Sequence, residues 1–195
     1  ANRRQHGIGR SIISHQSPTI RRRLYVETHK LMQVDNPVLN SAVAALNSGD
    51  QPHLATYVDR IVDYCVENEN GKVFEDWDRD TLRQLVAYHQ AKKTIIALSD
   101  NENNIQGVFM WYNCHEDDQW SFVYNWDEDK KDGDAIFMAF LFASTVSAWK
   151  QMVLKFIELE PDCLIKKLLG VRHRKGNPTR VEYSTKLFSK ILKSK

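Results

Sequence analysis

The chain has 195 residues, of which 42% are hydrophobic, and this fits one domain with extensions. No run of about 18 uncharged apolar residues occurs, so the sequence predicts no membrane span, and the basic N-terminus lacks the apolar stretch of a secretory signal. The three cysteines are widely spaced and odd in number, which favours reduced thiols and a cytoplasmic protein, or a virion component if the chain is phage-encoded.

Charge is distributed unevenly, although the formal net charge is only +2. Residues 1–23 hold six arginines and no acid, and residues 166–195 hold ten Lys or Arg against one acid. Clustered cations bind a polyanion such as nucleic acid, or they dock on an acidic protein surface, and the sequence leaves both open. The candidates for nucleic-acid or partner binding are Arg3, Arg4, Arg10, Arg21, Arg22, Arg23, Arg172, Arg174 and Lys175.

The pattern along the chain predicts a basic arm over residues 1–35, one domain over 36–188 and a lysine-rich tail over 189–195. Apolar spacing predicts a helix over 38–46 and a second helix that begins at an Asp50 cap and ends near residue 69. A third helix is capped by Asp78 or Asp80 and carries His89 on its apolar face. We interpret His89 as a core residue rather than a ligand.

Strand-type alternation follows the helices. It predicts a hairpin of residues 94–98 and 105–114, and then a third strand over 120–126. Aromatic residues crowd these strands, and we interpret them as a packed sheet face rather than a base-stacking surface.

The second half of the chain predicts a crossover unit. The strand 120–126 leads through a polar turn into a helix over 135–150, followed by a strand over 152–159 and a short helix over 162–169. A last strand is expected over 179–188. The predicted fold is therefore α+β, a three-layer arrangement around a mixed, mostly antiparallel sheet with one β-α-β crossover.

The turn before residue 135 has the character of an anion site. A turn that opens a helix presents unpaired N–H groups, and the helix dipole favours negative charge there. Gly133 would let the backbone approach a ligand closely.

Three motifs in order resemble the GNAT family, the Gcn5-related N-acetyltransferases. They are the hairpin with Gly107, the glycine loop beginning at Lys130, and Leu168-Leu169-Gly170-Val171. The resemblance spans about residues 38–188 and implies acetyl-CoA as the cofactor. The cofactor-binding residues that it implies are Lys130, Lys131, Asp132, Gly133, Asp134 and Ala135.

The resemblance also implies direct acetyl transfer to an amine of a protein or small molecule. Glu128 is our candidate base, with Glu116 as an alternative, and Tyr183 or else Tyr124 is the candidate proton donor to the leaving thiolate. Each has a structural interpretation as well, as a solvated acid or a packed aromatic. We expect no metal, because Cys114-His115 lacks a second ligand pair.

Two departures from the family favour a second hypothesis. The loop carries five carboxylates, at positions 127, 128, 129, 132 and 134, and Lys166 stands where the family often has tyrosine. The alternative is a non-enzymatic assembly protein on the same scaffold, such as a phage or viral component. Its basic arms would bind partner subunits or nucleic acid, and it could form an oligomer. A third hypothesis is an acyltransferase that its basic ends guide to nucleic acid or to nucleic-acid-binding proteins.

Overall fold

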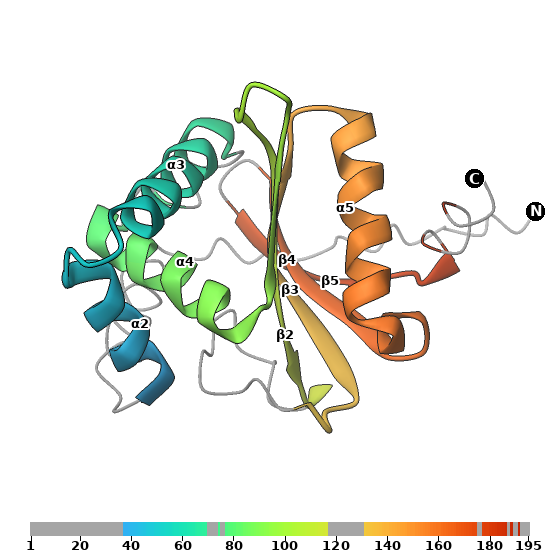
Figure 1. Cartoon of the computed structure of the whole chain (residues 1–195). Helices are drawn as coiled ribbons and strands as arrows, with labels where there is room; N and C mark the ends of the chain where they lie inside the picture. Colours follow the sequence, from blue (N-terminus) through green and yellow to red (C-terminus); the bar gives the residue numbers. More distant parts are fainter. Residues whose placement is uncertain are drawn as a thin grey trace, which may run out of the picture.

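The computed structural model describes residues 37–69, 74, 77–116, 131–174, 177–186, 188 and 191. The elements are α2 (Pro37–Asn47), α3 (Pro52–Asn68), α4 (Arg79–Lys92), β1 (Ile95–Ser99), β2 (Ile105–Cys114), β3 (Ala135–Ala143), α5 (Val146–Leu159), the 3₁₀ turn η3 (Pro161–Leu164), β4 (Lys167–Arg174) and β5 (Asn177–Tyr183). Helices α2, α3 and α4 cover one face of a five-stranded mixed sheet, and α5 covers the other (Figure 1). The predicted α+β class is confirmed.

The three helices of the first half are confirmed. The Asp78 carboxylate caps α4 as expected, because it accepts a hydrogen bond of 2.7 Å from the backbone N–H of Thr81. Helix α3 begins at Pro52, so its N-cap is Gln51, one residue later than the predicted cap Asp50. His89 is fully buried, and its Nδ1 lies 2.7 Å from the Thr94 hydroxyl, which confirms its place in the core.

The sheet has the order β1-β2-β3-β4-β5, and only β3 and β4 are parallel. The hairpin β1–β2 is confirmed. The strand that pairs with the other side of β2 is β3, whereas the predicted third strand over 120–126 lies outside the described residues.

The predicted helix over 135–150 is wrong. Residues 135–143 form β3, and α5 begins only at Val146. The sequence Ala-Ile-Phe-Met-Ala-Phe-Leu-Phe-Ala is apolar throughout because both faces of this central strand pack against helices. Such a strand has no alternation to distinguish it from a buried helix, and its three phenylalanines favour the extended form.

The elements after residue 150 are shifted for the same reason. The predicted strand over 152–159 is wrong, because it is the second half of α5, with Met152, Val153, Phe156 and Ile157 buried at helical spacing. The predicted helix over 162–169 is reduced to η3, and Leu168 to Val171 lie in β4. The last strand ends at Tyr183 rather than at 188. A parallel crossover exists as predicted, but it runs β3–α5–β4.

Two apolar layers form the core, one on each face of the sheet. On the α5 side, Phe109 and Trp111 of β2 pack against Phe156, with ring centroids 4.7 Å and 5.0 Å from the Phe156 ring. Phe109 and Trp111 are fully buried, which confirms the packed-face interpretation for β2, whereas the aromatic residues over 120–126 lie outside the described residues.

Within the described ranges, no helix is long and apolar enough to cross a membrane. The same residues contain no group of three His, Cys, Asp or Glu side chains placed to hold a metal ion.

Candidate functional site

The glycine turn at residues 131–134 lies against the end of β2. It leads into β3, so the helix N-terminus on which the predicted anion site depended is absent there. Gly133 is buried, and a Cβ built on it would lie 2.2 Å from the carbonyl oxygen of Cys114. Close packing against the end of β2 therefore requires glycine at this position.

The polar groups of the turn act as acceptors. The Asp134 carboxylate accepts the backbone N–H of Glu116 at 2.9 Å, and the Asp134 carbonyl accepts that of Lys167 at 3.3 Å. The Lys131 carbonyl accepts the Lys166 amine at 3.1 Å. Three oxygen atoms of this turn are therefore engaged by neighbouring donors.

Glu116 lies beside this turn and is held by two cations. Its carboxylate accepts hydrogen bonds from the Lys167 amine and, at 3.3 Å, from the Arg180 guanidinium. The hydrogen bond to Glu116 is the main cause of a raised pKa at Lys167. These ion pairs tie β2, β4 and β5 together, so Glu116 serves the sheet rather than acting as a free base.

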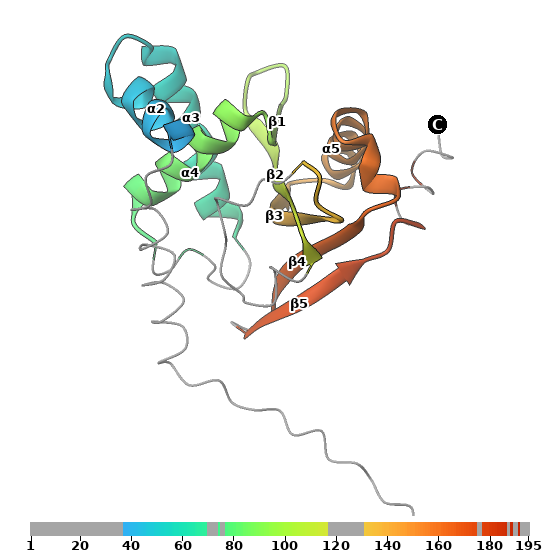
Figure 2. The same ribbon diagram turned by 90° about the horizontal axis from the view of Figure 1, so that it is seen from below.

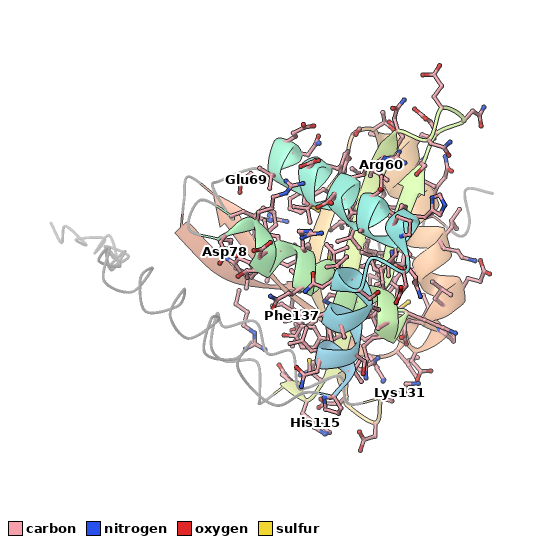
Figure 3. The ribbon with its side chains drawn as sticks, turned by 60° about the vertical axis from the view of Figure 1, so that its left-hand side comes forward. Arg60, Glu69, Asp78, His115, Lys131 and Phe137 are labelled. Carbon is pink, nitrogen blue, oxygen red and sulfur yellow. The ribbon has the colours of Figure 1, made fainter. Side chains whose placement is uncertain are left out.

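Lys166 also has a structural role. Its side chain is 13% exposed and its amine donates to the Asn113 side-chain oxygen at 3.0 Å. It stands just before β4, not in the short helix where the family resemblance had placed it. Figure 3 shows His115 and Lys131 at this same end of the molecule.

The parallel pair opens at the other end. Strands β3 and β4 pair over four positions, from Ala135↔Lys167 to Met138↔Gly170. Beyond these positions, in the described part of the sheet, residues 140–143 pair only with β2 and residues 171–174 pair only with β5. We call the space between 139–143 and 171–174 the β3–β4 opening. Figure 2 shows β4 and β5 running as a ribbon at an angle to the other strands.

A β-bulge marks the start of this opening. Met110 pairs with Phe140 and Trp111 pairs with Met138, so Ala139 has no partner in β2. A bulge bends its strand and increases the local twist, and here it comes immediately after the last β3–β4 pair, Met138↔Gly170.

Tyr183 lies at the apex of the opening. Its ring contacts Gly170, since a Cβ on Gly170 would lie 3.0 Å from Tyr183 Cε2 and 3.3 Å from the Met138 carbonyl oxygen. The exposed Arg172 places its guanidinium carbon 6.0 Å from the centroid of the same ring. The structure thus brings together Tyr183, Gly170 and Arg172, all of which sequence reasoning had named.

The wide end of the opening meets the first turn of α5. Thr145 caps this helix, and its Oγ1 accepts the Ala148 N–H at 3.0 Å. The amides of Val146 and Ser147 come too early in α5 to have an acceptor within the helix, and both residues are exposed. No acidic residue occurs between positions 135 and 157.

Tyr64 of α3 fixes the turn that precedes α5. Its hydroxyl lies 2.9 Å from the Gln106 carbonyl oxygen and 2.8 Å from the Ser144 hydroxyl. The Ser144 amide donates to the same carbonyl at 2.9 Å. Sequence reasoning missed this turn, although Ser144-Thr145 before an apolar periodic segment is an N-cap signal.

A separate groove of about 660 Å³ lies in the helical layer. Val38, Ala42, Leu54 and Ala87 are among the residues that line it. None of the predicted site residues contributes to it.

Several predicted site residues lie outside the described part of the chain. They are Glu128, Tyr124, Lys130, Lys175, Arg3, Arg4, Arg10, Arg21, Arg22 and Arg23.

No family model matches the chain, and neither a curated protein nor a solved structure is significantly similar to it.

Proposed function

We propose that this chain binds acetyl-CoA in the β3–β4 opening and transfers the acetyl group to an amine. The observation that carries the proposal is the divergence of two parallel strands immediately before a helix N-terminus. Separated strands leave backbone groups free to pair with an amide-containing chain such as the pantetheine arm. The amides of Val146 and Ser147 are placed to receive the diphosphate.

The charge around the start of α5 suits a diphosphate better than the charge around the glycine turn does. The segment from β3 through most of α5 has no carboxylate, whereas residues 127–134 carry five. A carboxylate beside a bound phosphate is repulsive, and the repulsion grows where water is excluded. The proposed diphosphate site is therefore the start of α5, at the opposite end of β3 from Gly133.

The length of β3 also fits. From Met138 at the apex to Ala143 at the wide end there are five residue steps, or about 17 Å at the usual rise of a strand. An extended pantetheine arm covers a similar span. The thioester would then lie near the apex, beside Tyr183.

Acetyl-CoA would supply an activated thioester. The acceptor nitrogen would form a bond to the thioester carbonyl carbon and lose a proton to water, while the carbon–sulfur bond would break and the sulfur would take a proton. Tyr183 is the candidate to donate that proton, because its ring contacts Gly170 at the position where the β3–β4 ladder ends.

Calorimetric titration of acetyl-CoA into a matched pair of variants tests the proposal. Ser147→Glu places a charge in the first turn of α5, where it stabilises the helix by about 0.3–1 kcal/mol but repels a diphosphate. Ser147→Gln changes the size similarly without the charge.

We expect wild type and Ser147→Gln to bind and Ser147→Glu to bind at least tenfold more weakly while melting at the same or a higher temperature. No binding by the folded wild-type protein, or equal binding by both variants, would contradict the proposal.

A further inference from the structure

The helices that cover one face of the sheet leave a groove between them. One stripe of α2 forms one wall, and Leu54 of α3 with residues near the end of α4 forms the other. We call this space the α2–α4 groove. Its volume of about 660 Å³ lies within the usual range of small-molecule sites, about 300–1,000 Å³. The groove is open because most of the facing residues are small, and these are Ser41, Ala42, Ala45, Ala87 and Ala91.

The α2–α4 groove suits a hydrocarbon chain. None of the described residues that line it is charged, and Ala42 and Ala87 are buried. Removing hydrocarbon from water into an apolar groove is favourable. The length fits as well, because the lining residues of α2 run from Pro37 to Ala45, which is about 12 Å at the usual rise of a helix. A saturated chain of medium length covers a similar span.

A polar group adjoins the groove at Gln90, which is one of its lining residues. Burial raises the pKa of Tyr57 in α3, while the charge of Arg60 and a side-chain hydrogen bond to Gln90 act in the opposite direction. Tyr57 therefore lies between Gln90 and a guanidinium. Figure 3 labels Arg60 on α3, in the same layer of helices as the groove.

The charge of Arg60 is not neutralised by its neighbours in α3. Asp59 and Asp63 are paired with α4, since Arg83 Nε lies 2.9 Å from Asp59 and Arg79 Nη1 lies 2.5 Å from Asp63. In the part of the chain that the structure describes, no ion pair joins Arg60 to an acid. Arg60 is partly buried, and a guanidinium beside an apolar groove attracts a carboxylate that carries a hydrocarbon chain.

We propose that the α2–α4 groove binds a medium-chain fatty acid. The hydrocarbon chain lies against the small residues of α2 and α4, and the carboxylate lies at the Gln90 side of the groove, where Arg60 attracts it. The groove is in the helical layer on the opposite face of the sheet from α5 (Figure 1), so the proposal is independent of acetyl-CoA binding.

The test is calorimetric titration of the full chain with decanoate below its micelle concentration. Ala91 is exposed at the rim of the groove, so Ala91→Trp fills the groove without disturbing the core. We expect this variant to bind decanoate about tenfold more weakly, because the chain loses apolar contact. The matched control is Ala44→Trp, the same exchange at an exposed position of α2 that is not among the lining residues, and it should bind as wild type does.

A second set of variants tests the carboxylate contact. Arg60→Gln should weaken decanoate by about two- to fivefold, the usual worth of a partly exposed ion pair, and should leave decanol binding unchanged. Arg60→Lys keeps the charge and should bind decanoate nearly as well as wild type. Lys150→Gln removes an exposed cation of α5, on the other face of the sheet, and should change neither affinity.

Ser41→Trp fills the groove from its α2 wall and replaces Ala91→Trp if that variant does not fold. Absence of decanoate binding by folded wild type would overturn the proposal, and so would equal affinities of Ala91→Trp and Ala44→Trp. Displacement of decanoate by acetyl-CoA would assign the chain to the β3–β4 opening instead. An equal effect of Arg60→Gln on decanoate and decanol would overturn the assignment to a carboxylate.

Discussion

Replacing Gly133 by alanine tests whether this glycine serves packing or ligand approach. The added Cβ would lie 2.2 Å from the carbonyl oxygen and 2.5 Å from the carbonyl carbon of Cys114. Both atoms belong to the backbone of β2 at its last pairing with β3, so the two strand ends must separate. Overpacking costs about 1–3 kcal/mol, and a clash with backbone atoms belongs at the upper end of that range. We expect Gly133→Ala to lower the free energy of unfolding by about 3 kcal/mol.

Gly49→Ala is the matched control. Gly49 has a φ of +72° and no neighbouring atom within 4 Å of a built Cβ, so its replacement is penalised by backbone conformation alone. That penalty is about 1–2 kcal/mol. Urea denaturation followed by far-UV circular dichroism gives both values, provided that the two variants share the wild-type m value. If Gly133→Ala were no more destabilising than Gly49→Ala, the packing argument would be refuted and a ligand role for Gly133 restored.

Three further predictions concern the scaffold. Asp78→Ala removes the cap of α4 and should cost about 1 kcal/mol in urea denaturation, with Asp78→Asn close to wild type. Tyr64→Phe removes the hydroxyl that joins Gln106 to Ser144; it should cost about 1–2 kcal/mol and weaken acetyl-CoA binding, and unchanged calorimetry would count against the site at α5. Burial raises the pKa of the Cys65 thiol to about 12 from 9.0. The unfolded state therefore loses this proton first, and stability should fall above about pH 9 by up to about 1.4 kcal/mol per pH unit. The fall should be shallower in Cys65→Ala.

The first half of the fold could be predicted because its signals are local. The Asp78 cap, the Asn47-Ser48-Gly49 break and the polar turn between β1 and β2 each act within a few residues. Asp100, for example, accepts the N–H groups of Glu102 and Asn104, which closes the hairpin without help from distant residues.

The prediction for the second half of the chain was wrong at β3. This strand is buried on both faces, and such burial removes the periodicity that distinguishes a strand from a helix. The error then spread along the chain. Lys150 and Gln151 suggested a break between two elements, whereas both are exposed positions within α5, with buried residues of the same helix on either side. Leu168 to Val171 were assigned to a helix end, although the same residues satisfy a strand buried between β3 and β5.

The candidate site was predictable in its residues but not in its geometry. Tyr183, Gly170 and Arg172 were named from the sequence, yet only the strand register brings them to one apex. The β3–β4 pairing ends next to the bulge at Ala139, which has no local sequence signal. The anion site was predicted at the glycine turn because a helix was expected to begin at Ala135, where the structure has β3.

The most direct test of the account is a map of backbone amide chemical shifts in the folded chain as acetyl-CoA is added. We expect the largest changes at Val146 and Ser147, with further changes at Gly170 and Tyr183, and little change at Lys131 to Asp134. Changes centred on Gly133, or no changes at saturating ligand, would contradict the assignment of the cofactor to the β3–β4 opening.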